Sequence, residues 1–162
     1  MKKISSMLKI CLCIVIAAAI AVSFAACGLS KEVTTADAFK TAAEGLGLTV
    51  EDTTGQYGDY GFLKSCTTAG SISGDTVEWS VDFMELDSVA DAQSSFTMNK
   101  STFESASGGM TTEINGTNYE SYSKGGSEEY MYVCRVESTL IYVRVPAEYK
   151  DAAKSLVDAI GY

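Results

Sequence analysis

Histidine is missing from this chain of 162 residues. It is the commonest general base in enzymes and the commonest side-chain ligand of transition metals. Its absence excludes catalytic triads built on histidine, histidine-ligated metal centres, and pH switches that titrate through an imidazole. Any chemistry must therefore come from carboxylates, hydroxyls, amines or thiols.

Cysteine is scarce beyond the first 27 residues, which contain three of the five in the chain. Only Cys66 and Cys134 follow, and two thiols without histidine cannot complete the usual tetrahedral zinc site, so we expect no metal and no other cofactor. An even pair in an exported protein favours a disulfide, which contributes about 2–4 kcal/mol to stability. Both cysteines fall in expected strands, so the other interpretation is two small apolar side chains buried in a core.

Basic residues are also few, at 12 against 21 acidic residues, for a formal net charge of −9. Residues 1–26 hold three of the basic residues and none of the acidic ones, which leaves nine basic residues and a net charge of −12 for residues 27–162. Such a charge repels phosphate backbones and anionic lipid headgroups. We therefore expect no nucleic-acid partner, and a domain that stands off a membrane surface rather than lying on it.

The first residues have the arrangement of an export signal. Three lysines precede an uncharged run from Ile10 to Phe24, and two alanines lead from this run to Cys27. The segment resembles the signal peptides of bacterial lipoproteins, in which a lipobox ends at an acylated cysteine; Phe24 stands where that box most often has leucine. An uncleaved anchor is the alternative, because Ile10–Ala26 spans 17 residues and a membrane span needs about 17–25.

The resemblance implies a signal peptide over residues 1–26, followed by lipidated Cys27 and a spacer over residues 27–33. It also implies a location on the outer face of the bacterial cytoplasmic membrane, in the cell envelope. Two or more acyl chains, such as palmitate, make a durable tether on one cysteine, whereas a single chain binds weakly. The remaining residues, 34–162, have the length of a single domain.

Helix-like and strand-like patterns alternate along residues 34–162. Apolar side chains recur at helical spacing in three segments, which begin near Thr34, Ser88 and Pro146. The clearest strand alternates polar residues, which should face water, with the apolar set Val77, Trp79, Val81 and Phe83. Short turns join the strands, including a type I′ hairpin turn at Asn115–Gly116. The sequence predicts an α+β fold: an antiparallel sheet of about five to seven strands with three helices packed on its face or faces.

Two patterns could carry catalysis, and each has a simpler interpretation. Ser121 and Lys124 fit the Ser-x-x-Lys motif of penicillin-recognising serine enzymes, but they fall in a strand and turn rather than at a helix start. Glu78 and Asp82 share one face of a strand and could serve a small hydrolase as a carboxylate pair. Charges that alternate with apolar residues are also what a half-exposed strand requires.

Tyrosine is the residue that most suggests binding, because four of the nine lie in or beside segments rich in glycine, serine and asparagine: Tyr57, Tyr60, Tyr119 and Tyr122. Their rings could form a ligand surface, although tyrosine is also a good strand residue. We therefore expect a noncatalytic domain that binds an envelope protein, peptide or glycan through a sheet face or through the loops at 52–60 and 116–127. The alternatives are a small envelope hydrolase that uses carboxylates and a solute-binding accessory of a transporter.

Overall fold

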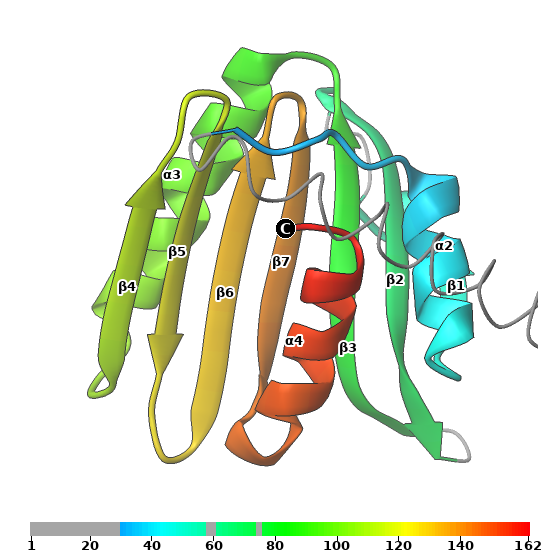
Figure 1. Ribbon diagram of the computed structural model, residues 1–162, viewed down its shortest axis with the longest axis vertical. Helices are drawn as coiled ribbons and strands as arrows, with labels where there is room; N and C mark the ends of the chain where they lie inside the picture. The colour runs from blue at the N-terminus through cyan, green and yellow to red at the C-terminus, as the bar shows by residue number, and fades with distance from the viewer. Residues whose placement is uncertain (1–29, 58–60, 74–75) are drawn as a thin grey trace, which may run out of the picture.

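The computed structural model describes residues 30–57, 61–73 and 76–162, and its central element is one antiparallel sheet (Figure 1). Seven strands form this sheet, in the order β1-β2-β3-β7-β6-β5-β4. They are β1 (Thr49–Asp52), β2 (Leu63–Ser73), β3 (Thr76–Leu86), β4 (Met110–Asn115), β5 (Tyr119–Gly125), β6 (Glu129–Val136) and β7 (Thr139–Pro146). Three α-helices accompany them within the described residues: α2 (Ala36–Gly45), α3 (Val89–Ser105) and α4 (Lys150–Ala159). The predicted α+β class is confirmed.

The sheet is made of two meanders joined at its centre. Strands β1 to β3 form the first meander and β4 to β7 the second, with α3 as the connection between them. The last strand of each meander pairs with the other, so that Val81 lies opposite Val143 and Phe83 opposite Ile141. Both edges of the sheet are therefore the first strands of their meanders, β1 and β4.

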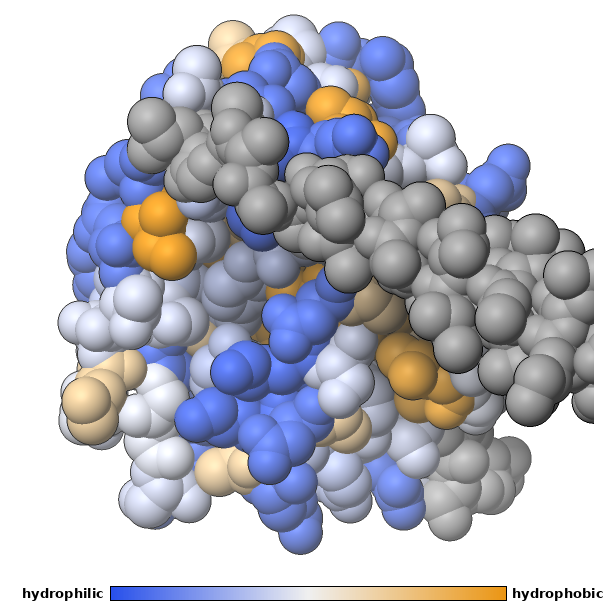
Figure 2. Space-filling model, viewed as in Figure 1, coloured by the Kyte–Doolittle hydropathy of each residue, from blue (hydrophilic) through white to orange (hydrophobic). Residues whose placement is uncertain are grey.

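Helices cover both sides of the sheet, so the molecule has three layers. Helices α2 and α4 lie on one side and α3 on the other (Figure 1). The core of the α2/α4 side includes Phe39, Trp79, Val81, Phe83, Cys134, Ile141, Val143 and Leu156. The core of the α3 side consists of Leu86, Ala92, Phe96, Phe103, Tyr122, Met131, Val133 and Leu140. The exposed side of α4 is hydrophilic in Figure 2, as the solvent side of an amphipathic helix should be.

Strand β3 follows the predicted alternation with two corrections. Trp79, Val81 and Phe83 are buried on the α2/α4 side, but Val77 near the strand start is 56 % exposed. Met84, on the face of β3 for which the alternation predicts exposure to water, packs partly buried against the α3 core. Met84 is partly buried because α3 covers the second side of the central strands. The local sequence of β3 does not indicate that a helix packs there.

Helices α2 and α3 each begin at a hydroxyl that accepts a backbone hydrogen bond. The Thr35 side chain accepts from the Ala38 amide at 3.2 Å, and Ser88 accepts from the Asp91 amide at 3.1 Å. These caps satisfy amide groups that have no partner inside the helix. The start of α2 is also held by the sheet, because Glu85 Oε1 accepts a hydrogen bond of 3.2 Å from the Ala36 amide.

The segment before α2 is fastened across the strand ends rather than acting as a free spacer. The Lys31 amide donates to Asn118 Oδ1 at 3.0 Å, and Lys31 Nζ donates to the Gly161 carbonyl at 2.7 Å. Figure 1 shows this segment running past the strand ends toward α2, near the C-terminus. The expected boundary between residues 27–33 and the domain therefore moves to Lys31. Residues 1–26 and Cys27 lie outside the described residues, and no helix in the described part is long and apolar enough to cross a membrane.

The hairpin between β4 and β5 turns later than expected. Gly116 and Tyr119 close the turn through a 2.8 Å hydrogen bond from the Gly116 amide to the Tyr119 carbonyl, so Thr117 and Asn118 form its tip. Neither Asn115 nor Gly116 has the positive φ angle that a type I′ turn requires. The Asn-Gly pair was thus a correct signal for a hairpin and an incorrect one for its centre.

Candidate interaction surface

The four tyrosines proposed as a ligand surface do not come together. Tyr119 is only 7 % exposed and belongs to the core on the α2/α4 side, whereas Tyr122 is 4 % exposed and belongs to the core on the α3 side. Tyr60 lies outside the described residues. Tyr57 is in the short 3-10 helix η1 (Thr54–Tyr57) and is partly buried. The sequence reading of these residues as one surface is therefore wrong, and for Tyr119 and Tyr122 the sheet-packing alternative holds.

Tyr57 fastens η1 to the sheet through Asp82. Its hydroxyl donates to Asp82 Oδ2 at 3.0 Å, while Thr68 Oγ1 donates to Asp82 Oδ1 at 2.7 Å. Thr53 Oγ1 lies 2.8 Å from Thr68 Oγ1 and extends the network. Burial, followed by the charge of Asp82, raises the pKa of Tyr57, so this phenol stays protonated and able to donate. Both carboxylate oxygens of Asp82 thus accept hydrogen bonds, and the bond from Tyr57 holds η1 against the sheet.

The cysteines are free thiols on opposite sides of the sheet. Cys66 lies opposite Met84, whose side chain packs on the α3 side, whereas Cys134 belongs to the core of the α2/α4 side. Strands β3 and β7 also lie between β2 and β6. At the usual spacing of neighbouring strands, β2 and β6 are therefore about 14 Å apart. A disulfide needs Cα atoms within about 7 Å, so the structure excludes the bridge and contains two buried thiols.

The Ser-x-x-Lys match is likewise split by the sheet. Ser121 pairs with Cys134 and faces the α2/α4 side, whereas Lys124 pairs with Met131 and faces the α3 side. Lys124 is only 6 % exposed, and its ammonium donates to the carbonyls of Phe103 at 3.1 Å, Glu104 at 3.2 Å and Ala106. This lysine binds the carboxyl end of α3, where carbonyls without helical partners attract a positive charge.

The carboxylate pair considered for hydrolysis also has structural partners. Glu78 Oε2 accepts a 2.9 Å hydrogen bond from Ser71 on the neighbouring strand, and Asp82 accepts those from Tyr57 and Thr68. The predicted common face of the two carboxylates is wrong. A register shift leaves Glu78 without a pairing partner on β2, and its hydrogen-bond donor Ser71 pairs with Trp79 of the α2/α4 side, whereas Asp82 faces the α3 side. Among the described residues, no three Asp, Glu or Cys side chains gather as a possible metal site.

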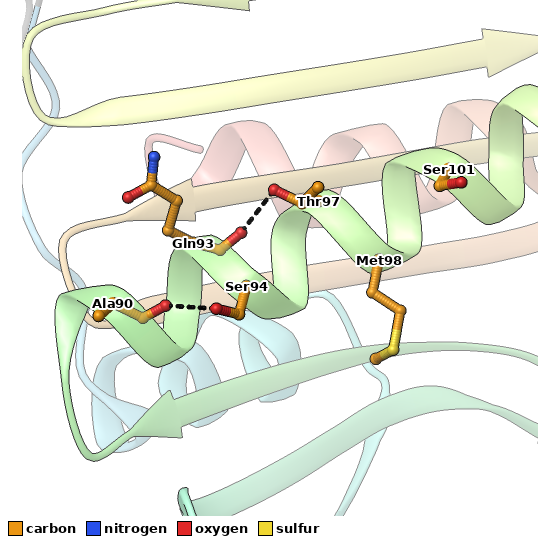
Figure 3. Close-up of a pocket in the computed structure, with 6 residues that line it drawn as sticks. All are labelled: Ala90, Gln93, Ser94, Thr97, Met98 and Ser101. Carbon is orange, nitrogen blue, oxygen red and sulfur yellow. Dashed lines mark hydrogen bonds between the residues drawn. The ribbon is translucent and has the colours of Figure 1, made fainter.

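The outward surface of α3 is an open and shallow face, which a single helix forms in the described part of the chain. We call it the α3 outer face; it consists of Ala90, Gln93, Ser94, Thr97, Met98 and Ser101 (Figure 3). None of the six is charged, although the chain carries a net charge of −9. Met98 is 63 % exposed, and its side chain projects away from the helix in Figure 3.

Hydrogen bonds within α3 make this face less polar than its composition suggests. Ser94 donates to the Ala90 carbonyl and Thr97 to the Gln93 carbonyl, each at 2.9 Å (Figure 3). A hydroxyl that donates to the helix four residues earlier has no proton left for a partner. The face therefore offers small side chains, hydroxyl acceptors and one adaptable thioether, a surface that suits close packing by another protein chain.

The sequence did contain a signal for this face. Only one stripe of α3 must be apolar for burial, and the opposite stripe of a solvent-facing helix is usually charged. Here the opposite stripe holds serine, threonine, alanine, glutamine and methionine. No family model, curated protein or solved structure matches the chain.

Proposed function

We propose that this chain is a lipid-anchored protein of the bacterial cell envelope whose domain is a noncatalytic binding module. It docks an envelope protein through the α3 outer face. The proposal is supported by the uncharged α3 outer face on an otherwise acidic chain, with Met98 63 % exposed at its centre. Methionine is enriched in protein interfaces, and charged residues are depleted at their centres.

The position of Lys31 supports the anchored arrangement. Its bonds to Asn118 and Gly161 fix the start of the domain at one end of the sheet. Cys27 precedes Lys31 by four residues, which span at most about 14 Å when fully extended. Acyl chains on Cys27 would therefore hold this end of the sheet close to the bilayer, while the net negative charge keeps the domain from lying flat on anionic headgroups.

Anchoring is tested by Cys27→Ala in the full chain. We expect the parent chain to incorporate labelled fatty acid and to partition into detergent with the membrane fraction. Cys27→Ala should incorporate no label. Equal labelling of both proteins would contradict acylation at Cys27, and an unlabelled parent chain would contradict acylation altogether.

Binding is tested by placing one positive charge on the proposed site and one elsewhere. Met98→Lys puts an ammonium in the centre of the α3 outer face, and Ser155→Lys puts the same group on the exposed side of α4 as the matched control. Full-length proteins are cross-linked in the native envelope, and captured proteins are compared by mass spectrometry. A partner captured by the parent and by Ser155→Lys, but lost with Met98→Lys, supports the proposal. Identical capture by all three proteins contradicts it.

A further inference from the structure

Strand β4 is an open edge of the sheet. Its six residues pair with β5 in a continuous register from Met110 opposite Gly125 to Asn115 opposite Glu120, without a bulge. All six are exposed, and no second strand pairs with β4 in the described part of the chain. Figure 2 shows separate hydrophobic patches along the edge that β4 occupies in Figure 1. Met110 is 86 % exposed and Ile114 is 48 % exposed.

The free backbone groups of this edge can be assigned from the hairpin. Gly116 donates to the Tyr119 carbonyl, so these two residues form a hydrogen-bonded pair. Hydrogen-bonded and non-hydrogen-bonded pairs alternate along an antiparallel ladder. Met110, Thr112 and Ile114 therefore direct their amides and carbonyls toward β5. The groups of Thr111, Glu113 and Asn115 point outward from the sheet.

The opposite edge of the same sheet is much less suited to pairing. Strand β1 has only four residues, and Glu51 and Asp52 place two carboxylates at its end. Short length and charge are the usual means by which a sheet edge avoids pairing with another chain. In β4 the sole charged side chain is Glu113, and Lys100 Nζ neutralises it at 2.6 Å from Oε1. The chain thus has one edge that resists pairing and one that permits it.

We infer that the β4 edge binds the β4 edge of a second copy of this chain, antiparallel, with Thr112 opposite Thr112 of that copy. The register follows from side-chain complementarity. It sets Met110 opposite Ile114 on the α2/α4 side of the joined sheet, so that the two exposed apolar residues of each edge cover each other. On the α3 side it sets Glu113 opposite Thr111, and these two residues exchange the hydrogen bonds of their outward groups.

Charge favours this register over its neighbour. A shift of two residues would put Glu113 directly opposite its own copy, and like charges directly opposite each other destabilise a sheet. In the inferred register the two Glu113 side chains are diagonal neighbours, and each keeps its Lys100. The net charge of each chain still opposes association at long range. Dimer formation should therefore strengthen as salt screens that repulsion.

Cysteine cross-linking tests the register in the full chain. Residues in a non-hydrogen-bonded pair have Cα atoms about 4.5 Å apart, within the range that a disulfide bridges. Thr112→Cys should therefore form a disulfide-linked dimer on mild oxidation. Residue 114 lies about 14 Å along the strand from residue 114 of the second copy. The Ile114→Cys variant should therefore form no more disulfide-linked dimer than the native cysteines alone give. Equal cross-linking by the two variants, or none by Thr112→Cys, overturns the register.

Association itself is tested by sedimentation of the purified full chain. Thr111→Pro removes an outward amide without removing a bond to β5, and Thr111→Val changes the same side chain but keeps the amide. We expect dimers for the parent and for Thr111→Val, and at least a tenfold weaker association for Thr111→Pro with an unchanged circular dichroism spectrum. A parent chain that stays monomeric at about 100 µM and high salt, where even a micromolar Kd gives mostly dimer, overturns the inference. Neither result depends on the α3 outer face.

Discussion

Replacing Lys124 by methionine should strongly destabilise the domain. Methionine keeps an unbranched apolar stem of similar length but cannot donate hydrogen bonds. The carbonyls of Phe103, Glu104 and Ala106 would each lose the donor that the ammonium provides. Met131, the pairing partner of Lys124, belongs to the buried core of the α3 side, which limits the water that could replace those bonds.

Two opposing terms set the size of the effect. Hydrogen bonds from a charged group contribute about 1.5–3 kcal/mol each, and a buried acceptor left without a partner costs about 1–3 kcal/mol. Against this, the folded state no longer has to desolvate an ammonium, which relieves several kcal/mol. We expect a net loss of about 2–4 kcal/mol in the free energy of unfolding. For a domain of this length that is a decrease of about 10 °C in melting temperature.

The measurement is thermal and urea unfolding of the full chain, followed by circular dichroism. Lys40→Met is the matched control, because Lys40 is 55 % exposed and lies 3.9 Å from Glu44 on the same helix. Such exposed pairs contribute about 0.3–0.5 kcal/mol, so its melting temperature should fall by no more than about 2 °C. If the melting temperature of Lys124→Met were as close to that of the parent as the melting temperature of Lys40→Met, the three hydrogen bonds would not contribute the expected stability.

Three further predictions concern ionisable groups. Burial raises the pKa of Cys66, and it raises the pKa of Cys134 to about 11. An alkylating reagent should therefore modify neither thiol in the folded chain and both thiols in denaturant. If neither cysteine were alkylated in denaturant, the two would be joined in a disulfide. Burial raises the pKa of Tyr130 to about 12 from 10.0, so its stabilising contribution should be complete below pH 10 and lost as the pH rises toward 12. Ultraviolet titration that shows ordinary phenol ionisation in the folded chain would contradict this. Lys100 lowers the pKa of Glu113 below its usual 4.5. Glu113→Gln should therefore destabilise the chain above pH 4.5, and the difference should disappear as the pH falls below 4.5 through the lowered pKa of the folded state. An equal loss at every pH would point to packing instead.

Local patterns predicted most of the elements correctly. Ser88 indicated the start of α3, and the alternation of β3 placed Trp79, Val81 and Phe83 in the core. These features act over a few residues, because caps, turns and strand periodicity depend on neighbouring backbone groups. Where a local signal failed, as at Asn115–Gly116, it was wrong about the centre of the turn and right about its existence.

The candidate site was predicted less well, because its prediction needed distances between segments far apart in the chain. The tyrosine surface failed since Tyr119 and Tyr122 lie three residues apart on one strand and face opposite sides. Ser121 and Lys124 are also three residues apart on this strand, so they face opposite sides of the sheet for the same reason. Composition marked all four residues as capable of chemistry, but only the sheet decided which side each side chain faces and which of them is buried.

The α+β class, the excess of acidic residues and the lack of histidine chemistry follow from composition and from the order of local patterns along the chain. Only the tertiary structure decided that β3 pairs with β7, that α3 covers the second side of the sheet, and that β4 is left as an open edge. The physical reason is that strand pairing and helix docking depend on apolar area buried between distant segments. The apolar area buried between distant segments cannot be calculated from a short stretch of neighbouring residues.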